Sequence, residues 1–500
     1  MFFTQETMNR LKIFFVFLFS LLVLPNLGTK PLWQDEAETA LVARQMVKTN
    51  TWLPYAFDDQ GPISQDWNYQ FKVSPLWRWH PWLQFYVTAL SFKLLGVSAF
   101  AARLPFALIG TAAYWYFLNF LTKHSPSLRG AKRRGNLAFF LTAAILFLLS
   151  TPLLLHLRQS RYYSLSLFFT LLTIDGYLDM QRSLLAAEQG DSSKYSLKYI
   201  LGSILLFHSF LPGALTLQLS FLIRTVLAVQ GQSLKNIKRF IIAFSTTLPF
   251  TLPWAIWLKI GGQNLNFSPE LIKQHLIQHY LYIHKFIFPA LTLIPIISPS
   301  LRKRFFRDDK LILFSIFISI SLLLYTFNHP YFFRYLVPLI PFFIYIAAWI
   351  IATAKPIWAI IPLISLILIT AKTFPKFLLE IAHPYQNANA EIIAFLSSLD
   401  HEKYQKLAIN YDDFTFRFHT SFTVYGAQQL ESPCPDVIII FPDWGNEEKL
   451  RQISQDCQLT PHPLLLHYAR LGDDPDQTNH KFSQPPLRTL EAFLAPPSPN

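Results

Sequence analysis

Three carboxylates follow the first apolar stretch of the chain with almost no spacer. The apolar run Leu11–Leu27 leads into Trp33-Gln34-Asp35-Glu36, and Glu38 comes two residues later. Carboxylates at a membrane surface lose hydration, so they are usually paired or functional there. Such a group can take a proton from a nucleophile, so Asp35 and Glu36 predict an active site that faces the outer compartment. The alternative is that they are ordinary interfacial carboxylates that cap the next helix.

Cations and histidines gather in the regions that we expect on the same side of the membrane. Arginine matches phosphate with its fork of donors, and such bonds are strong in a partly dry setting. Carboxylates beside several cations suit a site that binds an anionic lipid headgroup and deprotonates a nucleophile. For Arg78 the alternative is a snorkelling side chain, and for the many tryptophans it is interfacial anchoring. The candidate cations and histidines are Lys72, Arg78, His80, Arg158, Arg161, His208, His329 and Arg334.

The composition indicates which elements must hold these residues. Half of the 500 residues are apolar (52%), and apolar runs of about 17–22 residues recur, which is typical of polytopic membrane proteins. The net charge of +13 comes from Lys and Arg in short loops between these runs, as the positive-inside rule requires. No compact basic patch with stacking aromatics is present, which argues against a nucleic-acid partner. The sequence also lacks the HExxH, phosphate-loop and GxSxG motifs and a cluster of metal-ligating Cys and His.

The positions of the cationic loops, and the number of crossings needed between them, predict about 11 transmembrane helices. The N-terminus is expected in the cytoplasm, and the first span is expected to be an uncleaved signal anchor. The stretch 81–97 is short and polar enough that we expect it to lie along the outer interface. Asp175 and Asp179 are expected to face a polar interior of the bundle. The predicted spans are 11–27, 100–121, 136–155, 162–180, two within 199–229 that divide at Pro212-Gly213, 240–258, 281–299, 311–327, 332–351 and 356–371.

The fold class that follows is an all-α polytopic membrane bundle with a small α/β extracytoplasmic C-terminal domain. Residues 1–372 form the membrane domain, whose first outer loop (28–99) carries juxtamembrane helices, and residues 373–500 form the second domain. A helix is expected at 389–399 and strands at 406–410, 436–441 and 464–468, with a partly disordered tail. Cys434 and Cys457 either form a disulfide outside the cell or remain free thiols.

Three segments, in order along the chain, form a recognisable pattern. They are Trp33-Gln34-Asp35-Glu36-Ala37-Glu38 with Ala43-Arg44-Gln45-Met46 and Trp52-Leu53-Pro54; His80-Pro81-Trp82-Leu83 with Leu94-Leu95-Gly96-Val97 and Ala102-Arg103-Leu104-Pro105; and Phe333-Arg334-Tyr335-Leu336-Val337-Pro338-Leu339-Ile340-Pro341. The pattern resembles the GT-C superfamily of polytopic glycosyltransferases, in the branch that contains the protein O-mannosyltransferases and the aminoarabinose (lipid A) transferases. The first segment is similar to that family's first outer loop, the second to its juxtamembrane helix and following span, and the third to its late Arg-Tyr span. The resemblance extends over most of the chain.

This resemblance implies an enzyme of the cell membrane whose chemistry faces the extracytoplasmic side. The donor would be a sugar linked to a polyprenyl phosphate, and the acceptor (protein, lipid or glycan) stays open. Asp35, the first acid of the family's Asp-Glu pair, would be the general base, with Glu36 as its catalytic partner. Attack from the opposite face would invert the anomeric centre. The donor phosphate would be bound by Arg334, Lys72, Arg78, Arg161 and His80.

The chain departs from the family pattern at two positions. Tyr163 stands where many members carry a second acid, and Trp82 replaces the second proline of the juxtamembrane motif. The first change argues against a two-acid site with a bridging metal, so no residue is assigned as a metal ligand. No cofactor is certain, and a divalent metal stays open. The alternative functions are a lipid or solute transporter or flippase, and a non-catalytic receptor for an envelope lipid.

Overall fold

The computed structural model describes residues 5–63, 75–78, 80–125, 134–185, 193–228, 234–258, 268–327, 333–382, 388–426, 434–441, 445–467 and 487–496. The chain divides into two compact units. The first comprises 1–25, 78–83 and 106–378, and the second comprises 26–77, 84–105 and 379–500. The C-terminal region therefore shares a unit with the first outer loop. The predicted division at residue 372 separates a membrane domain from a domain outside the membrane, and it stays a prediction.

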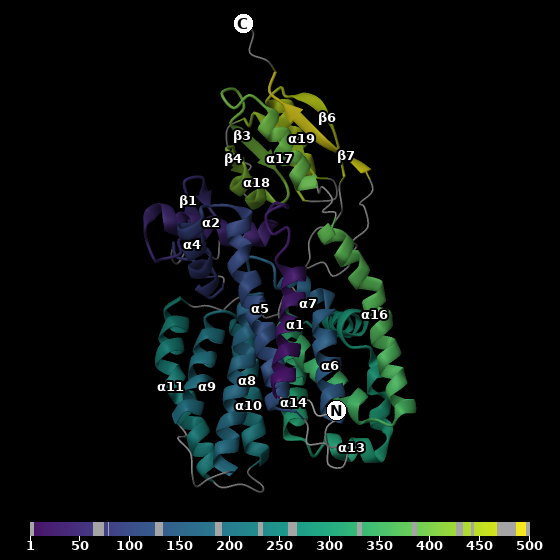
Figure 1. Ribbon diagram of the computed structural model, residues 1–500. Helices are drawn as coiled ribbons and strands as arrows, with labels where there is room; N and C mark the ends of the chain where they lie inside the picture. Colours follow the sequence, from purple (N-terminus) through teal and green to yellow (C-terminus); the bar gives the residue numbers. More distant parts are fainter. Residues whose placement is uncertain are drawn as a thin grey trace. The chain divides into compact units, whose positions relative to one another are not determined.

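The first unit is a bundle of helices, and Figure 1 shows α8, α9, α10 and α11 running side by side. Its longer helices are rich in Leu, Ile and Phe, and many of these side chains are exposed, which is typical of helices that face lipid. The helices are α1 (Gln5–Val23), α5 (Ala99–Lys123, from Phe106), α6 (Arg134–Leu148), α7 (Thr151–His156), α8 (Tyr163–Leu185), α9 (Ser193–Phe207), α10 (Leu211–Ala228), α11 (Leu234–Leu258), α12 (Pro269–Tyr282), a π turn (Ile283–Ile287), η2 (Ala290–Ile297), α13 (Pro299–Phe305), α14 (Asp309–Thr326), η3 (Phe333–Leu339), α15 (Ile340–Thr353) and α16 (Pro356–Ala382).

The described residues contain five helices that are long and apolar enough to cross a membrane, and a bent pair would make a sixth. Each of those five overlaps one predicted span, which supports the polytopic bundle. The predicted number of eleven is not confirmed and stays a prediction. The five helices are Ala99–Lys123, Phe240–Trp257, Asp309–Thr326, Phe333–Thr353 and Pro356–Leu379.

Two predicted spans differ from the structure, and prolines explain both differences. The span expected at 136–155 is interrupted between α6 and α7, where Pro152 lies in the first turn of α7. The span expected at 281–299 is instead a bent pair, Pro269–Ile287 and Ala290–Ile297, whose axes meet at 87°. Pro289 lies at the bend and lacks the N–H that would continue the helix.

Helices α8 and α9 approach each other through two glycines. A Cβ atom on Gly176 would lie 2.5 Å from the Tyr199 nitrogen, and one on Gly202 would lie 2.6 Å from the Thr173 hydroxyl. Neither space admits even a methyl group, so small residues let the two backbones meet, as is common between membrane helices. This close contact brings Asp175 of α8 and Lys198 of α9 within hydrogen-bond reach of each other.

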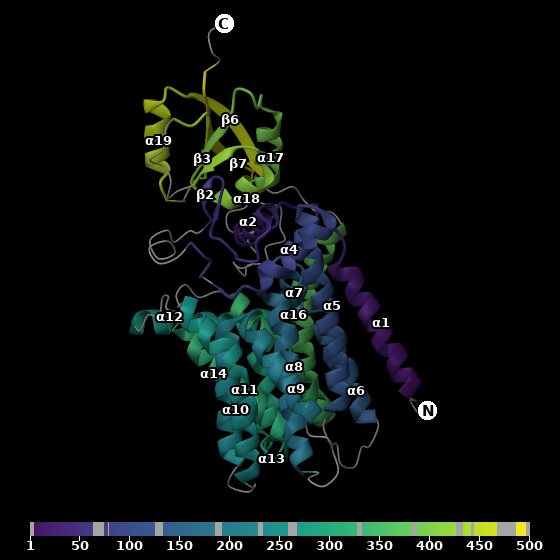
Figure 2. The same cartoon turned by 90° about the vertical axis from the view of Figure 1, so that its left-hand side faces the viewer.

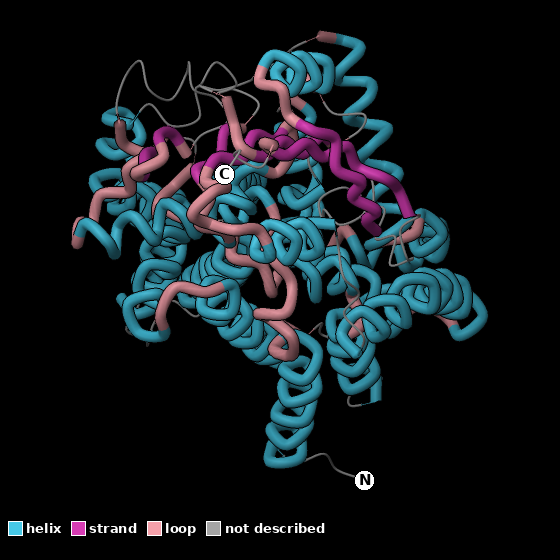
Figure 3. Tube along the Cα trace, turned by 90° about the horizontal axis from the view of Figure 1, so that it is seen from above, coloured by secondary structure: helices cyan, strands magenta, loops and turns pink. Residues whose placement is uncertain are grey.

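The second unit contains a five-stranded sheet in the order β4-β3-β5-β7-β6. Strands β3 (Lys406–Ile409), β4 (Thr423–Tyr425) and β5 (Val437–Ile440) are parallel, whereas β7 (Leu487–Leu494) is antiparallel to β5 and to β6 (Thr460–His467). Figure 3 shows the long β6–β7 pair from above. The predicted small α/β domain is therefore confirmed, with β4 and β7 added to the three strands expected.

Alternation along the central strands sends side chains to both faces of this sheet. Leu407 and Ile409 pack with α17 (Ala388–Ser398) and α18 (Asp413–His419), whereas Ala408 and Ile438 pack with α19 (Glu447–Asp456). Figure 2 shows α17 and α19 on opposite sides of the strands. A disulfide joins Cys434 to Cys457, just before β5 and just after α19.

The same unit holds the elements of the first outer loop. Helix α2 (Gln34–Thr49) starts at the acidic triplet, and the short strands β1 (Phe57–Asp58) and β2 (Gly61–Pro62) form a hairpin. Helix α4 (Leu83–Leu95) is the helix that we expected along the interface. Two helices within 28–99 confirm the expected helical character of this loop.

Replacing both Cys434 and Cys457 by Ser is expected to lower the free energy of unfolding of the sheet by about 3 kcal/mol, since the bond closes a loop of 23 residues. Hydrogen exchange of β5 and α19 in the full-length chain measures this loss. The reduced wild type should behave like the variant. Equal exchange in the oxidised wild type and the variant would contradict the expectation.

Candidate functional site

Two buried arginines and a histidine meet in the first unit. Arg161 precedes α8, Arg334 lies in η3, and His80 lies in the short segment before α4. Arg161 is 2% exposed and Arg334 7%. The Nη2 atom of Arg161 lies 3.1 Å from Nε2 of His80. These three residues come from distant parts of the sequence, and we call them the cationic group.

The protonation state of His80 follows from these neighbours. Burial, followed by the positive charges of Arg161 and Arg334, lowers the pKa of His80 well below its usual value. The ring is therefore neutral at neutral pH, and its Nε2 accepts the hydrogen bond that Arg161 donates. Arg78, which lies two residues before His80, is also buried. A region with this positive potential is chemically suited to bind a phosphate.

Aromatic rings surround the cationic group. The guanidinium of Arg161 lies 5.7 Å from the ring centre of Tyr162, which stacks on Phe210 at 5.1 Å. Tyr335, the neighbour of Arg334, stacks on the same phenylalanine at 6.0 Å. These rings hold the loop before α8, the start of α10 and η3 in one arrangement, so the arginines are positioned by packing as well as by charge.

Both positions at which the chain departs from the family pattern are packed against other rings. Tyr163 is fully buried and meets His156 edge to face at 5.1 Å. A phenol offers no carboxylate to a metal at this position, so the structure adds no support for a two-acid site. Trp82 packs edge to face on Trp254 and Trp257 of α11. Contacts between aromatic rings thus occupy both positions.

The acidic triplet lies in the second unit, at the first turn of α2. Asp35 is partly exposed, whereas Glu36 is fully buried and Glu38 is 6% exposed. Arg103, at the start of α5, binds Glu36 through two parallel hydrogen bonds of 2.9 and 2.5 Å. It also donates to the carbonyl oxygens of three residues that precede α2, at 2.8–2.9 Å: Leu27, Lys30 and Pro31.

Arg103 therefore ties the segment before α2 and its first turn to one guanidinium. Sequence reasoning included Arg103 in a motif but gave it no role. The observed contact gives Glu36 a binding partner, and its catalytic role stays a prediction, as does that of Asp35. Lys72 and His329 lie outside the described residues, so the structure does not place them.

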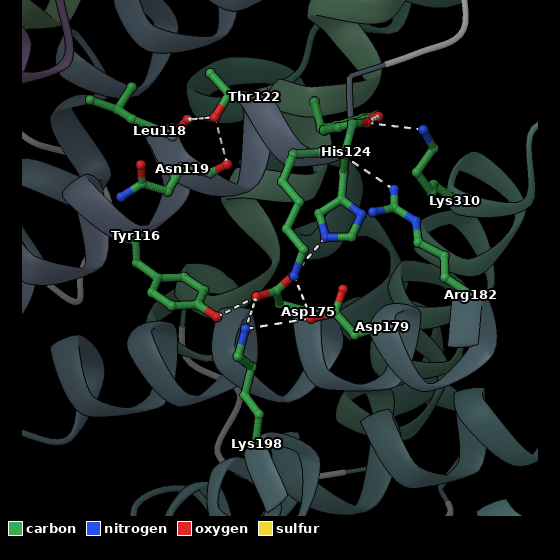
Figure 4. Close-up of polar contacts among 12 residues, drawn as sticks. Tyr116, Leu118, Asn119, Thr122, His124, Asp175, Asp179, Arg182, Lys198 and Lys310 are labelled. Atoms are coloured by element: carbon green, nitrogen blue, oxygen red, sulfur yellow. Dashed lines mark hydrogen bonds and ion pairs between the residues drawn. The ribbon is translucent and has the colours of Figure 1, made fainter. Parts of the chain in front are cut away.

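A second group of charged side chains, built on the buried carboxylates of Asp175 and Asp179, links α5, α8 and α9 (Figure 4). Asp175 accepts hydrogen bonds from Lys123 at 2.8 Å, Lys198 at 2.6 Å and Tyr116 at 2.5 Å. Its Oδ1 also lies 2.6 Å from Nε2 of His124, and Asp179 pairs with both lysines. The prediction that Asp175 and Asp179 face a polar interior is confirmed.

His124, Asp175 and Asp179 have the chemistry of metal ligands, and their ligand atoms lie within 4.8 Å of one another. Both carboxylates already bind the ammonium groups of Lys123 and Lys198, so two negative charges meet two positive ones. A metal ion would have to displace these lysines. The group is better explained as an ion-pair network that joins three helices.

Comparison with solved structures identifies the fold. The chain is similar to ArnT from Cupriavidus metallidurans bound to undecaprenyl phosphate, with a TM-score of 0.58 and 12% identity, over 97% of this chain and 98% of that one. The apo state of ArnT gives a TM-score of 0.57 and 13% identity with the same coverage. The resemblance to the aminoarabinose transferase branch is therefore confirmed at the level of the fold. No protein-family model matches the sequence, and no curated protein matches it.

Substituting Asp175 by Asn is expected to destabilise the protein by about 1–3 kcal/mol, because the partly exposed ammonium groups of Lys123 and Lys198 lose their charge-assisted hydrogen bonds to a buried carboxylate. Thermal unfolding in detergent measures the change. Arg10→Gln, which breaks an exposed pair with Glu6, is the control and should leave the unfolding temperature unchanged. An Asp175→Asn variant as stable as this control would show that the network contributes little.

Glu36→Gln and Arg103→Gln should each destabilise the second unit, since each leaves a buried charge without its bidentate partner. The double variant should lose much less than the sum of the two, because the second change removes the stranded charge. Unfolding monitored by hydrogen exchange of α2 supplies the three values. Additive losses would mean that the two residues do not act as a pair.

Proposed function

We propose that this protein is a membrane glycosyltransferase. It moves a sugar from a polyprenyl-phosphate-linked donor to an acceptor on the extracytoplasmic face, by a single displacement that inverts the anomeric centre. The N-terminus lies in the cytoplasm and the sheet domain outside. The observation that carries the proposal is the ArnT fold over 97% of the chain, together with a buried cationic group suited to phosphate.

The structural similarity to ArnT supports a donor linked to a polyprenyl phosphate. ArnT is an aminoarabinose transferase of the GT-C family, and its structure holds undecaprenyl phosphate. The matched fold covers 98% of that chain. Fold likeness at 12% identity leaves the sugar and acceptor undefined, so the proposal covers both hexose and pentose donors.

Asp35 is proposed as the general base. Its carboxylate takes the proton of the acceptor hydroxyl while that oxygen attacks the anomeric carbon of the donor. The bond from this carbon to the phosphate oxygen breaks, and its electron pair stays on the leaving phosphate. Proton and charge therefore balance without a redox partner. Asp35 is partly exposed at the first turn of α2, as expected of a base that meets an acceptor.

Arg161 and Arg334 are proposed to bind the donor phosphate and to neutralise the charge that grows on it, with Arg78, Lys72 and His80 in support. A lipid phosphate is a weak base, so cation contacts can take the place of a general acid. Neutral His80 keeps Nε2 as an acceptor for Arg161 and so orients that guanidinium. Glu36 would contribute through Arg103, by fixing the backbone next to Asp35.

The substitution Asp35→Asn should lower sugar transfer by about 10²–10⁴-fold, the usual contribution of a general base. Purified protein in liposomes, with radiolabelled polyprenyl-phosphate hexose or pentose, supplies the rate. The protein should keep its stability and its affinity for the lipid phosphate. Asp59→Asn is the matched control, because Asp59 is an exposed carboxylate of the same loop.

Transfer by Asp35→Asn at the wild-type rate would remove Asp35 as the base. Movement of the lipid between leaflets without sugar transfer, in the wild type, would favour a flippase. Binding of the lipid with neither activity would favour a receptor.

Arg161→Gln is expected to raise the KM for the donor or to lower kcat in the same transfer assay. The KM for the acceptor should stay unchanged.

A further inference from the structure

The second unit holds a set of contacts between α18 of the sheet domain and the chain just before Asp35 (Figures 1 and 2). The side-chain amide of Gln34 donates to Oδ1 of Asp413 at 2.9 Å, and its oxygen accepts from the Phe414 backbone N–H at 3.2 Å. Gln34 is thus bound on both sides of its amide at the start of α18. It is also the residue that directly precedes Asp35.

Leu32 is held by the same helix. Its carbonyl accepts from the Thr415 hydroxyl at 2.8 Å, and its N–H donates to Nε2 of His419 at 2.9 Å. That nitrogen accepts only while the ring is neutral. Burial, followed by the charges of Arg103 and Arg44, lowers the pKa of His419 to about 4, which keeps the ring neutral.

A buried ion pair fastens the other end of α18. Arg417 binds both carboxylate oxygens of Asp58 in β1, and it also donates to the carbonyls of Gly61 and Pro62 at 2.7 and 2.6 Å. The two charged side chains are only 2% and 5% exposed. Arg44 of α2 lies 3.7 Å from the same carboxylate. Asp58 therefore joins β1, α2 and α18, which belong to opposite ends of the sequence.

The sheet domain is shaped for this contact. Asp413 follows β3, at the edge where parallel strands of α/β folds usually bind ligands. A Cβ atom on Gly426, which follows β4, would lie 2.1 Å from Oδ2 of Asp413. Position 426 thus has no room for a side chain while Asp413 reaches Gln34. The strand edge that could hold a ligand instead holds the start of α2.

We propose that α18 of the C-terminal domain is a positioning element that sets the place of Asp35 through Gln34 and Leu32. The two neighbours of Asp35 are anchored independently, Gln34 by α18 and Glu36 by Arg103. Successive helical residues point about 100° apart, so these anchors fix the rotation of the first turn of α2. The inference rests on the proposed function only in naming Asp35 as the base.

The test compares Gln34→Met with Gln452→Met in the full-length protein. The first change removes both hydrogen bonds to α18 at nearly constant volume. The second removes an exposed Gln–Asp hydrogen bond within α19 of the same unit, so it is the matched control. Two readouts are needed: kcat and KM for sugar transfer, and hydrogen exchange of the peptide that covers residues 31–41.

Gln34→Met is expected to lower kcat at least tenfold with the donor KM within threefold of wild type, and to speed exchange in 31–41. Asp413→Asn, with Gln34 intact, keeps an acceptor oxygen for the Gln34 amide and should therefore retain most of the wild-type kcat. Unchanged exchange in Gln34→Met would overturn the positioning role whatever the activity. Faster exchange with unchanged kcat in Gln34→Met would also overturn it. If the wild type shows no sugar transfer, but Gln34→Met still exchanges faster than the wild type in 31–41, only the proposed function is contradicted.

Discussion

The bidentate ion pair between Glu36 and Arg103 is the contact on which the start of α2 depends. Arg103 holds Glu36 and three backbone carbonyls at once, so a single guanidinium sets the path of the chain into the helix. Buried charge is costly without a partner, and that cost makes the arrangement specific. Asp35 lies between this anchor and Gln34, so the proposed base stands on backbone that is held from two sides.

Other buried carboxylates are also paired with cations. Asp175 gathers two lysines, a histidine and a tyrosine and thereby joins α5, α8 and α9. Asp58 joins two ends of the sequence through Arg417 and Arg44. In an apolar bundle the hydrophobic effect does not select one helix neighbour over another, since lipid is equally apolar. Paired charges and glycine contacts such as Gly176 with Tyr199 supply that selection.

The cationic group was partly predictable from the sequence. Charge and topology grouped Arg161, Arg334 and His80 on one side of the membrane, and the structure brings these three together. In the C-terminal domain, the helix at 389–399 and three of the five strands were also predictable, because their periodicity is local. The break at Pro152 and the bend near Pro289 were missed, since hydropathy averaged over a span does not register how a proline is accommodated.

The sequence by itself determined that this chain is a polytopic helical membrane protein with a small α/β domain, since hydropathy and strand alternation are local properties. It also marked Asp35 and the arginines as candidates, through residue type and spacing. Only the tertiary structure decided that Glu36 belongs to Arg103 and that Asp413, Arg417 and His419 hold the first loop. Those partners lie about 70 to 390 residues apart, and no local periodicity links residues whose contact arises only when the chain folds.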